Sequence, residues 1–432
     1  MEPLLIGLDV GTTAVKAAAL DASGREIATG RAPTPWRTVP TGAELDPGEL
    51  LTAAAAAARE AVAAAGPGRV AGIGVASVAE TGVLLDPGGR PVVPSIAWHD
   101  SRGEAEAQRL ADDLGAAVFA ARVGLPASPL CTLAKYRWMR DHLPQTERGV
   151  RWLNVAEWIV AGFGGEPAAE LSLASRTGFY DLHARRPWDD ALAWAGAPAG
   201  LMPDAVPAGT PMGTASDAFP EGRGAVLTVG GHDHLAAAVG LGAAGEGDVL
   251  DSCGTAEAFV QASAPLAPEQ VARAVAGGIS VGWHAIEGRQ AMLGAHWSGA
   301  ELQRVLSALG VAPDDRGAIE AAALDIERTG AAGDERSPGA VYHAALDEVG
   351  RHGAEILAHM AAVAGPARRL VVTGGWAAGP AAQAVKERHL GAFELSPALF
   401  SGGARGAALA AGRAAGLWSV DDAPHVAVQE VR

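Results

Sequence analysis

The sequence predicts an α/β protein with two halves of similar design, and three observations carry this prediction. Apolar segments typical of buried strands alternate with segments that have apolar residues at helical spacing. A strand, a small-residue turn and a return strand occur in LIGLDVGTTAVKAAAL near the start, and again in VLDSCGTAEAFVQAS at 249–263. A stretch rich in Ala, Gly and Pro at 196–224 separates the two and is typical of a linker.

The first half begins with a strand at residues 4–10, followed by a glycine turn, a return strand and a third strand through REIATG. Because no helix follows the glycine turn, this is not the start of a Rossmann fold. A helix is expected at 49–65, and the segment Gly66-Pro67-Gly68 that follows is typical of a helix end. Strands are expected at 69–77 and 83–86, and the chain from 102 to 195 is mainly helical in its spacing.

The second half begins with a new buried strand at 225. The repeated strand–turn–strand follows at 249–263, and residues 368–387 predict a strand, a glycine turn and a helix. A helix that starts in glycines is expected at 401–416. With 432 residues the chain is long enough for two or three domains, and we place two of them at 1–218 and 219–432.

Composition excludes several classes of protein. The chain has 33 Lys and Arg against 49 Asp and Glu, so its formal net charge is −16, which argues against nucleic acid as a partner. Hydrophobic residues make up 49%, enough for a sizeable core. Two cysteines, Cys131 and Cys253, make no disulfide framework. Neither a signal peptide nor a membrane span is expected, so we predict a cytoplasmic protein.

The glycine turns carry the candidate chemistry. A Gly-Thr turn between two strands directs successive backbone N–H groups into a concave nest that can bind phosphate oxygens. Asp9 precedes the first turn, where a carboxylate could hold Mg²⁺ through water. A plain hairpin beside a buried aspartate would look the same. A second such turn, together with Gly374-Gly375 before a helix, favours one nucleotide held between two domains, without a P-loop motif.

Several segments occur in the order seen in the FGGY carbohydrate kinases, and the chain resembles this family from residue 4 to about 416. The segments are GLDVGTTAVKA, AELDPGELL, VLLDPGGRPVVPSIAWHDSR, GGHDHLAAAVGLGAAGEGDVLDSCGTAEAF and VVTGGWAAGP. The resemblance implies two ribonuclease H-like domains of the actin-like ATPase superfamily. It also implies that ATP and a sugar meet in the cleft between them.

The resemblance assigns a role to each motif. It implies that Asp233, in GGHDH, is the catalytic base and that Asp9 lies near Mg²⁺. A carboxylate suits the first role, because the attacking hydroxyl must lose a proton during phosphoryl transfer. The residues implied to bind ATP belong to the two phosphate turns and the adenosine motif, and are Gly11, Thr12, Thr13, Gly254, Thr255, Ala256, Gly374 and Gly375.

The histidines beside Asp233 allow a second interpretation. His232 and His234 could bind zinc together with Asp233. We take the two side chains to point to opposite sides, which weakens a shared metal site.

Substrate-side residues follow from the stretch after the strand at 69–77 and from the W-x-D-x-R segment. The resemblance places Glu80, Thr81, Trp98, Asp100 and Arg102 there. Trp98 could equally be a core aromatic, and Arg102 a structural ion-pair partner. Glu80 resembles the acid that glycerol kinases use, although their preceding arginine is Ala79 here, and the Gln-Met-His-Gly segment of xylulose kinases is absent. The GHDH and AETG segments suggest an L-fuculokinase-like branch.

The expected function is ATP-dependent phosphorylation of a sugar or polyol, with a pentulose or hexulose favoured as acceptor. A polyol or glycerol-type kinase is one alternative, and a non-catalytic or sensor-like nucleotide-binding protein of the same superfamily is another. The segment before Gly374 is short for the family, and Trp376 stands where a small residue is common, so the adenine side departs most from the family pattern. A homodimer is a further expectation.

Overall fold

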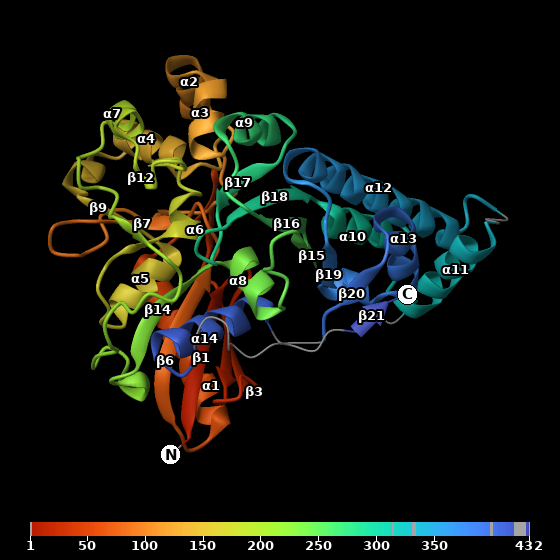
Figure 1. Ribbon diagram of the computed structural model, residues 1–432, viewed down its shortest axis with the longest axis horizontal. Helices are drawn as coiled ribbons and strands as arrows, with labels where there is room; N and C mark the ends of the chain where they lie inside the picture. The colour runs from red at the N-terminus through yellow and green to blue at the C-terminus, as the bar shows by residue number, and fades with distance from the viewer. Residues whose placement is uncertain (1, 313–314, 331–333, 398–400, 419–428, 432) are drawn as a thin grey trace.

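The computed structural model describes residues 2–312, 315–330, 334–397, 401–418 and 429–431, and Figure 1 shows two lobes, each built on one main sheet. The five strands of the first sheet, in spatial order, are β14 (Val226–His232), β6 (Arg69–Ser77), β1 (Pro3–Val10), β2 (Ala14–Leu20) and β3 (Glu26–Pro33). β1, β6 and β14 are parallel, whereas β2 is antiparallel to both β1 and β3. The N-terminal hairpin is therefore confirmed.

Helices α1 (Pro47–Ala65) and α14 (Gly402–Ala414) pack on the first sheet. α1 contacts mainly β2 and β3, and α14 contacts β1, β6 and β14. Glycines let α14 approach closely, because a Cβ at Gly7 or Gly74 would overlap the carbonyl oxygen of Ala404 or Ala407. Alanine and glycine in both elements thus bring the helix backbone directly onto the strands.

The expected boundary after residue 218 does not separate the two sheets. β14 pairs with β6 in the first sheet, and α8 (Asp233–Gly240) follows it. The Ala-, Gly- and Pro-rich stretch before β14 crosses the same lobe, where β13 (Ala205–Val206) pairs with β10 (Ala169–Glu170). The Ala-, Gly- and Pro-rich composition indicated correctly that regular secondary structure is interrupted here. Which lobe a strand joins depends instead on its pairing partner, and that partner can lie far away in the sequence.

The second sheet has seven strands. In spatial order they are β17 (Ser280–Trp283), β18 (Gln290–His296), β16 (Glu257–Ser263), β15 (Asp248–Cys253), β19 (Arg369–Thr373), β20 (Phe393–Leu395) and β21 (Gln429–Val431). β15 is antiparallel to β16 and parallel to β19, just as β1 is antiparallel to β2 and parallel to β6. The predicted internal repeat is confirmed.

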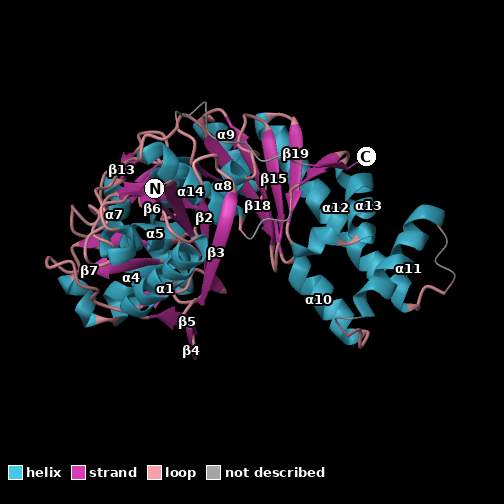
Figure 2. Ribbon diagram, turned by 90° about the horizontal axis from the view of Figure 1, so that it is seen from below, coloured by secondary structure: helices cyan, strands magenta, loops and turns pink. Residues whose placement is uncertain are grey.

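Five helices accompany the second sheet: α9 (Pro268–Ala276), α10 (Ser298–Ala308), α11 (Arg316–Thr329), α12 (Pro338–Ala364) and α13 (Pro380–Leu390). Figure 2 shows α10 to α13 grouped at the outer end of this lobe. Aliphatic and aromatic side chains from these helices, among them Leu302, Ile319, Tyr342 and Val385, form a core of their own.

The region inserted in the first half is mainly helical, as the sequence predicts. Its helices are α2 (Glu104–Leu114), α3 (Ala116–Val123), α4 (Thr132–His142), α5 (Val155–Gly162), α6 (Leu171–Ala174) and α7 (Asp189–Ala195). Short strands in and before this region form small sheets separate from the main one. They are β4 (Arg37–Val39), β5 (Gly42–Leu45), β7 (Gly82–Leu85), β8 (Ser95–Ile96), β9 (Arg151–Asn154), β11 (Tyr180–Asp181) and β12 (Arg186–Pro187).

The two lobes meet where this helical region contacts β17. The backbone N–H of Val281 donates to the carbonyl of Gly124 over 2.8 Å, and Trp283 Nε1 donates to the carbonyl of Leu182 over 2.9 Å. One hydrophobic core runs across the contact, with Phe119 and Trp188 from one side and Phe259 and Met292 from the other. Within the described ranges, no helix is both long and apolar enough to span a membrane.

Candidate active site

The first Gly-Thr turn, Gly11–Thr13, connects β1 to β2 and is held on several sides. The N–H of Gly11 donates to the carbonyl of Ala14 over 3.1 Å, which closes the turn. Two indoles bond to Thr12: Trp36 Nε1 donates to its carbonyl over 2.7 Å, and Trp98 Nε1 donates to its hydroxyl over 3.0 Å. The turn is therefore fixed by its neighbours and is more than a free hairpin loop.

Asp9 lies on β1 just before this turn, with one carboxylate oxygen bonded and the other without a protein partner. Oδ2 accepts a hydrogen bond from the hydroxyl of Ser401, the N-cap of α14, over 2.6 Å. Oδ1 is buried and has no hydrogen-bond partner in the described chain. Burial raises the pKa of Asp9, while the Ser401 bond and the charges of Lys16 and His234 act against it. A free oxygen of this kind suits a hydrated cation.

Asp233 is the first residue of α8 and lies at the same edge of the sheet as Asp9. Ala76 of β6 is paired with Asp9 of β1 on one side and with Gly231 of β14 on the other. The carboxyl ends of three parallel strands thus bring the two acids together, as expected for a site at a sheet edge. Burial raises the pKa of Asp233 well above its ordinary value, and the charge of Asp9 raises it further.

The histidines flanking Asp233 do not form a metal site in the part of the chain that the structure describes. The two rings are nearly perpendicular, with centroids 5.4 Å apart, and His232 Nε2 lies 3.2 Å from Asp233 Oδ1. Burial lowers the pKa of both rings, so each favours the neutral form. The described residues contain one group with ligand atoms close enough for a metal, and it lies elsewhere.

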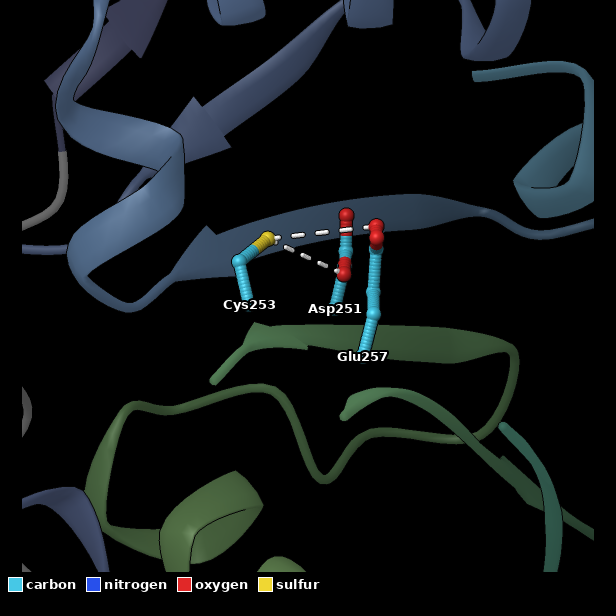
Figure 3. A group of neighbouring side chains, drawn as sticks. All are labelled: Asp251, Cys253 and Glu257. Atoms are coloured by element: carbon cyan, nitrogen blue, oxygen red, sulfur yellow. Dashed lines mark hydrogen bonds between the residues drawn. The ribbon is translucent and has the colours of Figure 1, made fainter. Parts of the chain in front are cut away.

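That group consists of Asp251 and Cys253 of β15 and Glu257 of β16, whose side chains come together on one face of these paired strands (Figure 3). Lys386 of α13 occupies the place of a cation, because its ammonium lies 2.7 Å from Asp251 Oδ2 and also donates to Glu257 Oε1. Burial raises the pKa of Cys253 well above its ordinary value, so the thiol is protonated and unreactive. The group is a buried ion-pair cluster beneath the second Gly-Thr turn.

The second turn, Gly254–Ala256, and the glycine turn at 374–375 lie against each other. The N–H of Gly254 donates to the carbonyl of Ala256 over 3.1 Å. Gly374 has φ +104°, and a Cβ there would overlap the carbonyl oxygen of Cys253. Because Gly254, Thr255, Gly374 and Gly375 are exposed, their backbone groups are accessible to a ligand.

The start of α10 completes the surroundings of the second turn. The N–H of Ala300 donates to the carbonyl of Thr255 over 2.9 Å, and a Cβ at Gly299 would overlap the carbonyl oxygen of Gly254. Trp297, at the N-cap, is 60% exposed and stacks on Trp98 of the first lobe with ring centroids 6.4 Å apart. The indole pair therefore connects the surroundings of the first and second Gly-Thr turns.

Glu80 lies in the loop after β6, next to this edge of the first sheet. It is one of two non-glycine residues with positive φ among the described positions, at +59°. Its Oε1 accepts from Arg176 Nε over 2.6 Å, and its charge contributes to the raised pKa of Asp233. Thr81 is fully buried, and its hydroxyl has no bonding partner in the described chain. The structure therefore brings Glu80 close to Asp233.

Asp100 and Arg102 belong to an internal ion-pair network. Arg102 Nη2 lies 2.8 Å from Asp100 Oδ2, and Arg102 Nη1 lies 2.9 Å from Glu44. Asp100 also accepts from the N–H of Ala43 over 2.8 Å, which ties the W-x-D-x-R segment to β5. Arg102 is therefore an ion-pair partner within the protein in this structure. Contact of Asp100 or Arg102 with a substrate stays a prediction.

Sequence reasoning missed several residues at the site, of which Arg176 is the clearest. It bonds Glu80 and also donates from Nη1 to Ser280 Oγ of β17 over 2.7 Å. The only sequence feature that could have pointed to Arg176 is that it is a single charged residue in the short segment LSLASRT. Trp297 and Lys386 were missed for the same reason, since their partners are distant in sequence.

Comparisons with known proteins place this geometry in a family. The model of the FGGY family of carbohydrate kinases, N-terminal domain, matches residues 4–240, which extends past β14 and α8. A xylulose kinase from Streptomyces coelicolor is 33% identical over 254 residues, covering 56% of this chain and 50% of that protein. A glycerol kinase from Bordetella parapertussis is 28% identical over 462 residues, covering 96% of this chain and 89% of that protein. The chain thus aligns with about half the length of the xylulose kinase.

Solved structures share the fold over nearly the whole chain. The xylulose kinase from Rhodospirillum rubrum has a TM-score of 0.86 at 23% identity, with 99% of this chain and 93% of that chain covered. The Plasmodium falciparum glycerol kinase with ADP has a TM-score of 0.87 at 15% identity, with 100% and 94% covered. These neighbours confirm the expected α/β fold with two domains. On the family match and the order of its motifs, the chain belongs to the FGGY family of carbohydrate kinases.

Proposed function

We propose that the protein transfers the γ-phosphoryl group of ATP to a hydroxyl group of a sugar or polyol, with Asp233 as the general base. The observation that carries the proposal is the pair of carboxylates, Asp9 and Asp233, at the carboxyl ends of β1 and β14, two parallel strands that lie on either side of β6. Asp9 leads into the first Gly-Thr turn, and Asp233 begins a helix with a carboxylate whose pKa is raised by burial. Family membership supports the same reaction class.

The acceptor oxygen forms a bond to the γ-phosphorus while the bond from that phosphorus to the bridging oxygen breaks, and ADP leaves with the electron pair. The hydroxyl proton passes to a carboxylate oxygen of Asp233. A raised pKa makes Asp233 a better proton acceptor than an ordinary exposed aspartate, because the protonated acid is favoured in its buried position. Alignment of the acceptor hydroxyl with the γ-phosphate supplies the remaining rate enhancement.

The described residues fit a magnesium nucleotide. Asp9 Oδ1 is buried without a protein partner and offers a carboxylate oxygen to a hydrated cation. Gly254 and Gly374 are exposed and carry no side chain, so the backbone groups of these two turns are open to phosphate oxygens. When bound, magnesium offsets negative charge on the phosphate groups.

For the acceptor we propose a pentulose, with glycerol or another polyol as the alternative. The names of the similar proteins, xylulose kinase and glycerol kinase, favour these two classes. Glu80 offers a carboxylate to acceptor hydroxyls close to Asp233, with one oxygen already engaged by Arg176. The L-fuculokinase-like branch, a hexulose acceptor and a homodimer remain predictions of the sequence.

A panel assay tests the proposal. The purified chain is incubated with MgATP and, separately, ketopentoses, ketohexoses, aldoses and glycerol, and ADP release is followed. We expect turnover with one acceptor class, and Asp233→Asn should lower kcat by about 10²- to 10⁴-fold. Calorimetry should show that this variant still binds MgATP. ATP turnover indifferent to every acceptor would contradict a kinase, and nucleotide binding without turnover would favour the sensor-like alternative.

A further inference from the structure

The short segment from Leu171 to Arg176, which contains α6, bonds to the backbone that leads into Asp233. The Ser172 hydroxyl accepts a hydrogen bond from the N–H of His232 over 2.9 Å. His232 is the N-cap of α8 but makes no side-chain capping bond of its own. Ser172 thus supplies a partner for the peptide group immediately before the proposed base, from a segment 60 residues away in sequence.

The backbone at this point is irregular, so it needs an external support. The pairing of β14 with β6 shifts register between Val229 and Gly231. Gly231 has φ +106°, and a Cβ there would lie 2.7 Å from Ser172 Oγ. The strand end therefore rests directly on Ser172, and its conformation is one that other residues rarely adopt.

A buried chain of acids fixes the direction of the Ser172 hydroxyl. Ser172 Oγ donates to Glu170 Oε2 over 2.7 Å, and Glu170 also accepts from the N–H groups of Ser172 and Leu173 over 2.9 and 3.0 Å. A hydroxyl has one hydrogen, so donation to Glu170 leaves its lone pairs for His232 N. The N–H of Glu170 is in turn held by Glu157 Oε1 over 2.7 Å. All three side chains are buried.

We propose that Ser172, oriented by Glu170, is a positioning residue that fixes the His232–Asp233 backbone and so aims the Asp233 carboxylate. This inference rests on the proposed function in assigning the base to Asp233. Without the hydroxyl, the N–H of His232 loses its partner and the first residue of α8 is free to shift. A displacement of about 1 Å can lower the rate of a well-aligned reaction about 10²-fold.

Ser175, in the same short segment, offers a matched control. Ser175 is also buried, donates to the carbonyl of Ser172 over 2.9 Å, and accepts from the N–H of Trp283 over 3.1 Å. Ser172→Ala and Ser175→Ala therefore each remove one buried hydroxyl and one partner of a backbone N–H. Their losses of thermal stability should be similar, but only Ser172 contacts the segment that carries Asp233.

Kinetics on the two variants separate positioning from general destabilisation. We expect Ser172→Ala to lower kcat about 10- to 100-fold with an unchanged KM for ATP, and Ser175→Ala to keep kcat within about threefold. In an Asp233→Asn background, Ser172→Ala should cost much less than in the wild type, because both changes act on one group. Equal kcat losses in the two serine variants, or full additivity with Asp233→Asn, would overturn the proposal.

A second variant and crystal structures test the same positioning role independently. If Ser172→Ala does not fold, Glu170→Gln replaces it, since the amide keeps the size but disturbs the acceptor set, and kcat should fall while the KM for ATP holds. Crystal structures of the wild type and the variant decide without turnover. A displaced His232–Asp233 backbone supports positioning and an unmoved one refutes it, even if the wild type phosphorylates no acceptor and the proposed function fails.

Discussion

Lys386 is a buried ammonium that lies between two acids. Its side chain is 6% exposed, and those of Asp251 and Glu257 are 0% and 2% exposed. One cation balances only one carboxylate, and burial together with the charge of Glu257 raises the pKa of Asp251 to about 7. Although burial acts to raise the pKa of Glu257 as well, hydrogen bonding from His296 and the charge of Lys386 hold it below its ordinary value.

Removing this ammonium should be costly. We expect Lys386→Met to lower the free energy of unfolding by about 3–5 kcal/mol, because two buried carboxyls lose their counter-charge. Urea denaturation measures the change. Arg351→Met is the control, since Arg351 also lies between two acids but is 50% exposed, so its loss should stay within about 0.5–1 kcal/mol. Similar losses for both variants would show that the cluster is not effectively buried.

Glu157 and Glu170 should make stability depend on pH. Burial raises the pKa of each from 4.5 to about 7. Between these values the folded state binds more protons than the unfolded state, so the contribution is full below about pH 4.5 and is lost as the pH rises towards 7.

The Glu157→Gln variant isolates the effect of one acid. The amide cannot ionise, so the variant should gain stability relative to the wild type as the pH rises from 5 to 7.5, by roughly 3 kcal/mol at most. Any loss from the altered hydrogen bonds to Asn154 is independent of pH and does not hide the slope. Chemical denaturation at several pH values measures it, and a pH-independent difference would contradict the raised pKa.

At the scale of elements, the turn after β19 is the most constrained. Gly374 has positive φ and its inner side abuts Cys253, whereas no atom lies within 4 Å of a Cβ built at Gly375. Gly374→Ala should therefore destabilise the protein by about 1–3 kcal/mol through strain and overlap. Gly375→Ala should change the free energy of unfolding by no more than about 0.5 kcal/mol. Thermal unfolding of the pair tests this, and equal effects would argue against the tight contact.

The elements also show what sequence can predict. Both hairpins, β1–β2 and β15–β16, were predictable because a strand, a Gly-Thr turn and a return strand are written in consecutive residues. β14 was found as a strand but assigned to the wrong lobe, because its partner β6 lies far back in the chain. Glu80 was found by resemblance, yet its partner Arg176 is 96 residues away and left no local signal.

At the scale of the molecule, the stacked indoles of Trp98 and Trp297 connect the lobes. Trp98 also bonds Thr12 of the first turn, and Trp297 precedes the helix that contacts the second. Binding of MgATP with an acceptor should move these rings and change tryptophan fluorescence. The change should shrink in Trp297→Phe and persist in Trp194→Phe, which alters an indole of the inserted helical region. An unaltered signal in Trp297→Phe would show that this pair does not report lobe movement.

The hydrogen bond from Ser401 to Asp9 has a consequence for how the protein is made. The two residues are 392 positions apart, and α14, which Ser401 caps, covers one face of β1 and β6. During synthesis, β1 leaves the ribosome early, but the helix that covers it leaves only after the whole second sheet except β21 has been made. The first lobe therefore cannot finish folding in the order of translation, and its sheet keeps an uncovered apolar face until α14 returns to it.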